Sequence, residues 1–159
     1  MARSRTLLAA ALGGLFLSAG SSPSHAEAAD TARTATVAVA TPGSLYERLG
    51  GADKVSAFVD DTIDRVAADP RMNQSFDKVN LKHVKDMLLE QICSLAGGGC
   101  KYTGDTMRDV HAGHHISNAE FFQLVEVLRD SMREHGVALS ERNELLQILA
   151  PMKRDVVER

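Results

Sequence analysis

Three of the six histidines in this 159-residue chain lie within five residues, in the stretch MRDVHAGHHIS at 107–117. His111 follows Met107 by four residues, so in a helical turn the two share one apolar, inward face. His114 and His115 come after a glycine at which we expect the helix to end, and they are interpreted as solvent-exposed or capping residues. The spacing leaves three interpretations open: a zinc or copper site of all three histidines, a single haem ligand at His111, or a core histidine without metal.

Local helix signals indicate which segments position these histidines. Capping boxes at Ser44–Glu47 and Ser117–Glu120 each predict a helix start, and Asn80 can cap a third helix. The first three helices are expected to end at Gly50-Gly51, at Asp69-Pro70 and at residues 97–99. A short turn or helix is expected over 105–112, and a last helix follows Ser140 and is bent by Pro151.

Apolar residues in these segments recur at intervals of three and four, which is typical of helices that bury one face. The expected inward positions are Val55, Phe58, Val59, Ile63 and Val66; Leu81, Val84, Leu88, Ile92 and Leu95; Phe121, Leu124, Leu128 and Met132; and Leu145, Ile148, Leu149, Met152 and Val156. The fold class is therefore all-α. Such a core is filled either by aliphatic side chains alone or with a flat apolar cofactor between the helices.

The first 26 residues have the features of an export signal: Arg3 and Arg5, then the apolar run TLLAAALGGLFLSAG and small residues ending at Ala26. The run is shorter than the roughly 20 residues of a membrane span, so we expect cleavage, with an uncleaved anchor as the alternative. Residues 27–43 are small and rich in alanine and threonine, which predicts a flexible linker. One domain is left over 44–159, exported to the periplasm and without a stable membrane span once the signal is removed.

The net charge and the two cysteines indicate which partners and which catalytic chemistry are not expected for this chain. Cleavage removes two arginines and no acidic residue, so the formal net charge goes from -3 to -5, which argues against nucleic acid as a partner. Cys93 and Cys100 could form a disulfide in an oxidising compartment, because the glycines between them can fold the chain back; two unpaired thiols are the alternative. Neither cysteine lies in a context that favours thiol catalysis.

Several motifs, taken in order, resemble a group I truncated haemoglobin. They are LYERLGG (45–51), RVAADPRMNQSF (65–76), GGGCKYTG (97–104) and MRDVHAGHHI (107–116), and the match continues in register to LAPMKRDVV (149–157). The resemblance implies a globin fold of two helices over two, with haem b clamped between the third helix and a short proximal segment. His111 corresponds to the proximal iron ligand and Phe76 to the phenylalanine that packs flat on the haem.

Further haem contacts follow from the same resemblance. Met107, Val110 and Ile116 match the proximal wall, and Val84, Leu88 and Ile92 are expected to exclude water from the iron. The candidate partners of the haem propionates are Lys85, Lys101, Tyr102 and Arg108.

The distal side departs from the family pattern. Many relatives carry a tyrosine in the second helix that hydrogen-bonds bound oxygen, but this chain has Ile63 there, beside Thr62. Positions of the third helix that often hold glutamines or a histidine carry Val84, Met87 and Leu88. A lost charge-assisted hydrogen bond costs about 1.5–3 kcal/mol, so we expect roughly ten- to hundredfold weaker oxygen retention.

Met87 occupies the position at which some relatives place an iron-binding histidine. Its thioether could be a sixth ligand, with His83 one turn earlier as a second candidate, or it is an apolar filler. The resemblance implies reversible binding of oxygen, nitric oxide or carbon monoxide, and a reductase or other electron donor. The alternatives are a His/Met-ligated redox protein and a haem-free sensor or interaction domain; an enzyme activity such as nitric oxide dioxygenation is left open.

Overall fold

The computed structural model describes residues 43–158, without the side chains of residues 73 and 74, and this part of the chain contains helices and no strand. The export signal expected at 1–26 and all but the last residue of the linker lie outside the described residues. The elements are α1 (Leu45–Arg48), α2 (Gly51–Ala68), the 3₁₀ helix η1 (Asn73–Phe76), α3 (Leu81–Leu95), α4 (Met107–His111), α5 (Asn118–Glu134), α6 (Leu139–Leu149), the 3₁₀ helix η2 (Ala150–Met152) and α7 (Lys153–Val156). No described helix has the length and apolarity that a bilayer crossing requires.

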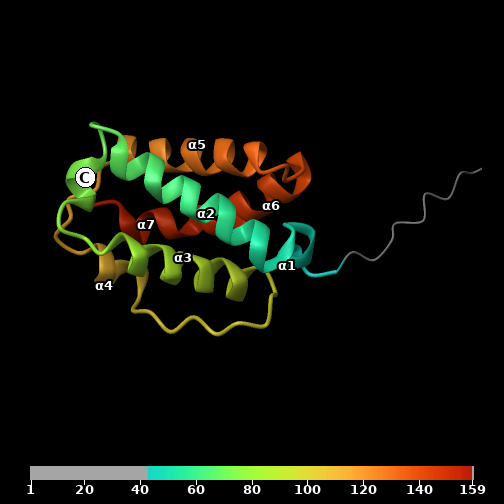
Figure 1. Ribbon diagram of the computed structural model, residues 1–159. Helices are drawn as coiled ribbons and strands as arrows, with labels where there is room; N and C mark the ends of the chain where they lie inside the picture. The colour runs from blue at the N-terminus through green and yellow to red at the C-terminus, as the bar shows by residue number, and fades with distance from the viewer. Residues whose placement is uncertain (1–42, 159) are drawn as a thin grey trace, which may run out of the picture. The chain divides into compact units, whose positions relative to one another are not determined.

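Two pairs of long helices form the domain. Helix α2 packs on both α3 and α5, and α5 packs on α6, so the α2–α3 pair lies against the α5–α6 pair (Figure 1). The short helix α4 packs on α7, and a long loop joins α3 to α4 (Figure 1). The all-α prediction is confirmed.

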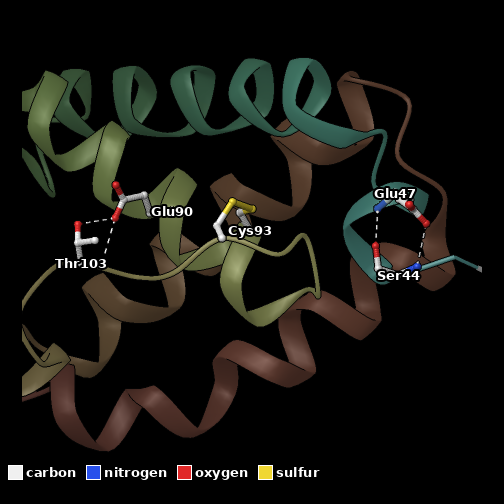
Figure 2. Close-up of a disulfide and its surroundings, with 6 residues drawn as sticks. Ser44, Glu47, Glu90, Cys93 and Thr103 are labelled. Carbon is white, nitrogen blue, oxygen red and sulfur yellow. Dashed lines mark hydrogen bonds between the residues drawn. A yellow bond between two sulfur atoms is a disulfide. The ribbon is translucent and has the colours of Figure 1, made fainter.

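The predicted helix starts are confirmed by their hydrogen bonds. At Ser44 the hydroxyl accepts from the Glu47 amide at 3.3 Å and the Ser44 amide donates to the Glu47 carboxylate at 3.0 Å (Figure 2). Ser117 and Glu120 form the same capping box, and the Asn80 side chain accepts from the His83 amide. These bonds satisfy amides that a helix start leaves without a partner inside the helix.

The last helix differs from the prediction. It begins at Leu139, with Ala138 as the capping residue, so Ser140 lies inside the first turn. Pro151 interrupts the helix instead of only bending it, because α6 stops at Leu149 and the chain passes through η2 before α7. Proline lacks the amide that the helical ladder needs and its ring clashes with the preceding turn.

Seven of the nineteen expected inward residues are buried in one core shared by α1, α2, α3, α5 and α6. Its members are Leu45, Leu49, Val55, Phe58, Val59, Ile92, Ala96, Leu128, Met132, Val137 and Leu145. Ile63, Val66 and Met72 form a second cluster, against which Phe76, Val84 and Leu88 pack. Leu95 was expected inward but is 39% exposed, because at the last position of α3 no element among residues 43–158 covers it.

The cysteine pair forms a disulfide, as predicted, and ties the end of α3 to the loop that follows it (Figure 2). The return of the chain depends on Gly98, where a Cβ atom would lie 2.7 Å from the Cys93 sulfur and from the Tyr46 ring. The Thr103 amide and hydroxyl also donate to the Glu90 carboxylate, at 3.1 and 2.8 Å. Two ties therefore hold the α3–α4 loop against α3.

Reducing this disulfide is expected to lower the free energy of unfolding by about 2–3 kcal/mol, because the bond closes a short loop in the unfolded chain. Urea unfolding with and without a thiol reductant measures the difference. The Cys100→Ser variant is the matched control. Its urea midpoint should equal that of the reduced protein and should not change when the reductant is added. Equal midpoints for the oxidised and reduced protein would contradict the expectation.

A polar network joins α2 to α5 at Asp61. The carboxylate accepts from Arg65 at 2.8 Å and from the buried Ser131 hydroxyl, and it faces His135 at 3.7 Å. Partial burial opposes ionisation, but the hydrogen bonds from Ser131 and Arg65 outweigh it and lower the pKa of Asp61. A carboxylate with a lowered pKa stabilises the fold above its unfolded value of about 3.9, and the contribution is lost as the pH falls through the folded value.

Asp61→Asn is therefore expected to reduce the free energy of unfolding by about 1 kcal/mol at pH 7 and to weaken the loss of stability below about pH 4. Chemical unfolding between pH 3 and pH 7 measures both effects. The control is Asp77→Asn, at an exposed carboxylate in the turn before α3, which should reproduce the parent pH profile. Parallel profiles for the Asp61 variant and the parent protein would count against this role.

Candidate functional site

A cavity of about 910 Å³ lies between α3 and α4 and extends to α5 and α6. This volume is in the range of small-molecule and cofactor sites, roughly 300–1,000 Å³. The cavity wall includes these residues from the sequence prediction: Thr62, Ile63, Phe76, His83, Val84, Met87, Leu88, Tyr102, Met107, Val110, His111 and Ile116. The structure thus brings together residues from α2, η1, α3, α4 and the loops beside α4.

Ile92, the remaining predicted contact, does not line the cavity. It is fully buried in the main core. Each residue of a helix turns the side chain by about 100°, so Ile92 lies about 80° away from Val84 around α3. Gln91 lies only about 20° from Val84, and it is Gln91 that faces the cavity.

His111 is the last residue of α4 and is half-buried on the cavity wall. The Thr106 side chain caps this helix by accepting from the Asp109 amide. The His111 Nδ1 atom lies 2.6 Å from the carbonyl oxygen of Met107, one turn earlier. Because a carbonyl can only accept, Nδ1 carries the proton, and Nε2 keeps a lone pair that is available to a metal.

The other two histidines of the stretch do not complete a metal cluster. Both are exposed; His114 contributes to the cavity wall, and His115 has Nδ1 3.2 Å from the Glu158 carboxylate. Over residues 43–158, no group of three or more histidine, cysteine, aspartate or glutamate side chains is arranged to hold a metal ion. The described part of the chain therefore does not support a zinc or copper site of the three histidines.

The α2 side of the cavity offers little hydrogen bonding. Ile63 is apolar, and the Thr62 hydroxyl donates at 2.6 Å to the Phe58 carbonyl of its own helix. The proton of Thr62 is therefore already committed. Val84 and Leu88 on α3 add further apolar wall.

Gln91 is a cavity residue that the sequence analysis missed. It is only 8% exposed, and its amide nitrogen lies 3.1 Å from the Met107 sulfur and 3.7 Å from the Met152 sulfur. Thioether sulfur is a weak acceptor. Its position seven residues after Val84, on the same apolar face, was the signal that could have found it.

The three cations expected near the haem propionates do not line the cavity. Lys85 pairs across to α2 with Asp64 at 2.8 Å, Arg108 pairs with Asp155 at 2.8 Å, and neither they nor Lys101 line the cavity. Tyr102 does line it, with its hydroxyl donating to the Asp105 carbonyl at 3.1 Å. The cationic side chains on the wall, histidines apart, are Arg129 and Lys153.

Comparison with known proteins identifies the family in which this arrangement of helices and cavity occurs. The sequence pattern of the bacterial-like globins matches residues 44–158, nearly all of the described chain. The chain belongs to this family. Among curated relatives, the group 1 truncated hemoglobin GlbN of Mycolicibacterium paratuberculosis is 30% identical over 117 residues, 74% of this chain and 86% of that protein. The group 1 truncated hemoglobin of Tetrahymena pyriformis is 28% identical over 116 residues, 73% of this chain and 96% of that protein.

Solved structures of truncated haemoglobins agree with the fold. The Fe(III) form from Tetrahymena pyriformis superposes with a TM-score of 0.70 at 26% identity, covering 74% of this chain and all of that one. The 2/2 hemoglobin of Synechococcus, in the cyanomet state and with covalently attached heme, gives a TM-score of 0.68 at 27% identity, again over 74% and 100% of the two chains. The predicted arrangement of two helices over two is confirmed.

This truncated haemoglobin is a haem-binding globin that binds gas ligands. The cavity fits the cofactor on two counts. Its wall is largely apolar, as a flat macrocycle requires, and it includes His111, whose Nδ1 bond leaves the other ring nitrogen for iron. A structural metal cluster would need a different donor set.

Proposed function

We propose that this truncated haemoglobin holds haem b through Nε2 of His111. The observation that carries the proposal is the bond from His111 Nδ1 to the Met107 carbonyl, because it orients the ring and leaves Nε2 for iron. Both cysteines are consumed in the disulfide, so neither is free to form a thioether link to the cofactor. This supports haem held by the histidine and by apolar contact, the arrangement of a b-type haem.

The other wall residues shape the site around that ligand. When bound, haem supplies an iron atom with a coordination position for a small gas molecule. Phe76, Val84 and Leu88 supply apolar surface from η1 and α3 and exclude water. Met107, Val110 and Ile116 do the same from α4 and the segment after it, and Val110 is the most exposed of the three, at 41%.

The gas ligand we propose is oxygen, nitric oxide or carbon monoxide, bound reversibly. Ile63, Val84 and Leu88 donate no hydrogen bond, and the Thr62 hydroxyl is committed to its own helix. Oxygen gains more than carbon monoxide from a donor, so we expect rapid oxygen release and comparatively strong carbon monoxide binding. Reaction of nitric oxide with oxygen requires retained oxygen, so we propose a binding function in preference to catalysis.

A second function, electron transfer, is favoured by the position of Met87. This half-buried side chain lies on the cavity wall, one turn of α3 from both His83 and Gln91. A thioether opposite the histidine would give His/Met ligation, which raises a haem potential. Either function would need an electron donor to keep the iron reduced, and a reductase in the same compartment is the partner we propose.

The absorption spectrum of the purified ferrous protein tests these proposals. A five-coordinate spectrum is expected for the gas binder. A six-coordinate spectrum that becomes five-coordinate in Met87→Leu would support the electron-transfer protein, and retention of the six-coordinate form would direct attention to His83. Absence of a Soret band after addition of haem would reject both functions and support the haem-free sensor or interaction domain.

We also propose that the globin domain is exported and acts in the periplasm. The charged and apolar pattern of residues 1–26 supports export, and the Cys93–Cys100 disulfide suits an oxidising compartment. Cell fractionation with intact-mass analysis tests this. The expected product is a periplasmic chain that begins at Glu27, and a full-length chain in the membrane fraction would favour the uncleaved anchor.

A further inference from the structure

The turn that follows His111 has a backbone that needs outside support. Gly113 has φ 79° and His115 has φ 55°, both in the left-handed region. His115 and Lys78 are the non-glycine residues with positive φ among residues 43–158. A side chain with a Cβ atom is disfavoured there, so the surrounding structure must hold the conformation in place.

The carboxylate of Glu158 provides that support. One of its oxygens accepts from the Gly113 amide at 2.7 Å and the other accepts from the His115 amide at 2.8 Å. The Glu158 amide in turn donates to the Ile116 carbonyl at 2.9 Å. Amides that converge around left-handed residues form a concave site for an anion, and here the anion belongs to the same chain.

The Gly113 amide has the largest effect on the pKa of Glu158 and the His115 amide the next largest. Both donate to the carboxylate and lower its pKa, so the side chain remains a carboxylate. The two-oxygen geometry requires that form. A glutamine at this position would keep one acceptor and would direct an amide group at the second N–H, where two donors would meet.

The segment that Glu158 holds is short. Helix α4 has five residues, too few to fix its own conformation, so its neighbours determine where it lies. Its first turn is joined to α7 by the Arg108–Asp155 ion pair, and its last residue is followed by the turn bound to Glu158. Val156, 8% exposed, anchors the end of α7 in the protein interior.

We propose that Glu158 is a positioning residue for His111: by holding the turn at Gly113 and His115, it fixes the end of α4 and the orientation of the imidazole toward haem. This inference rests on the proposed role of His111 as the iron ligand. It assigns to the end of the chain a part in cofactor retention, although Glu158 itself does not line the cavity.

The test compares three variants of the haem-loaded protein: Glu158→Gln, His115→Gly and, as a control, Glu144→Gln. Glu144 is exposed and pairs with Arg48, and neither residue lines the cavity, so this variant makes the same chemical change away from α4 and the cofactor site. The readouts are amide hydrogen exchange at Gly113 and His115, the rate of haem transfer to excess apo-globin, and the iron–histidine stretching band of the ferrous protein. Circular dichroism checks that each variant is folded.

Glu158→Gln is expected to accelerate both amide exchange and haem transfer about fivefold or more, as for one lost hydrogen bond, and to shift or broaden the iron–histidine band. His115→Gly keeps both amides and suits the left-handed backbone, and the imidazole contact with Glu158 that it removes is largely exposed, so it should stay within about twofold of the parent protein. Glu144→Gln should behave as the parent protein does.

Two results for Glu158→Gln would overturn the inference. Unchanged amide exchange in Glu158→Gln would show that the carboxylate does not hold the turn. Faster exchange with unchanged haem transfer and an unchanged iron–histidine band would show that the contact stabilises the turn without positioning His111. If His111→Ala retained haem and the band, the proposed ligand would be wrong and this inference would fail with it; loss of haem in His111→Ala beside an unaffected Glu158→Gln rejects the inference alone.

Discussion

His111→Ala is expected to abolish stable haem incorporation. His111 lies on the cavity wall with its ring oriented by a backbone bond, from Nδ1 to the Met107 carbonyl, and with Nε2 left for iron. Alanine removes the proposed protein bond to iron and leaves only apolar contacts to hold the cofactor. The haem-to-protein ratio after purification and the Soret absorbance measure the effect.

The matched control replaces His114 and His115 together with alanine. Both side chains are exposed, so their loss should leave the spectrum nearly unchanged, although His114 contributes to the cavity wall. Purification of His111→Ala with full haem and parental axial ligation would show that another residue, such as Met87 or His83, binds the iron.

Ile63→Tyr is expected to slow oxygen release by roughly tenfold or more, as for one recovered hydrogen bond to the ligand. Ile63 is 2% exposed and lies on the cavity wall, so a side chain extended from this position of α2 has space to enter. Stopped-flow release rates measure the effect. Ile63→Phe is the control, because it adds the ring without the hydroxyl and should not slow release to the same extent.

Met87 could hide this effect by binding the iron in place of oxygen. If it does, Ile63→Tyr would slow oxygen release only after Met87→Ala has freed the coordination position. The double variant is therefore measured beside the two single variants. Slow oxygen release in the unmodified protein would contradict the apolar distal wall. Gln91 would then be the first donor to examine, through Gln91→Leu, because its amide nitrogen lies on the cavity wall against the weakly accepting sulfurs of Met107 and Met152.

Much of the architecture could be predicted from local sequence. The capping boxes at Ser44 and Ser117 work through bonds that span three residues, so they form wherever the chain runs as a helix. The orientation of His111 is local too, because its partner Met107 is one turn away on the same helix. The spacing of the histidines alone left a haem ligand as one of three interpretations. The resemblance to truncated haemoglobins then indicated haem as the cofactor.

The tertiary structure decided which partner each helix face meets. Periodicity places Val84, Leu88 and Ile92 on one side of α3, but the side chains rotate along the helix, so Ile92 enters the core while Gln91 reaches the cavity. Lys85 and Arg108 suited an anionic cofactor by charge alone, yet Asp64 and Asp155 lie close enough in the fold to pair with them.

The contacts of Glu158 could not be predicted from the sequence either, because its partners are far away along the chain. It meets Gly113 and His115 across more than forty positions of sequence, at separations of 45 and 43 residues. A hydrogen bond within one turn follows from helical geometry, so the sequence determined the capping boxes and the orientation of His111. A contact at long separation depends on where the intervening helices α5, α6 and α7 return the chain, and packing of the whole domain sets that position.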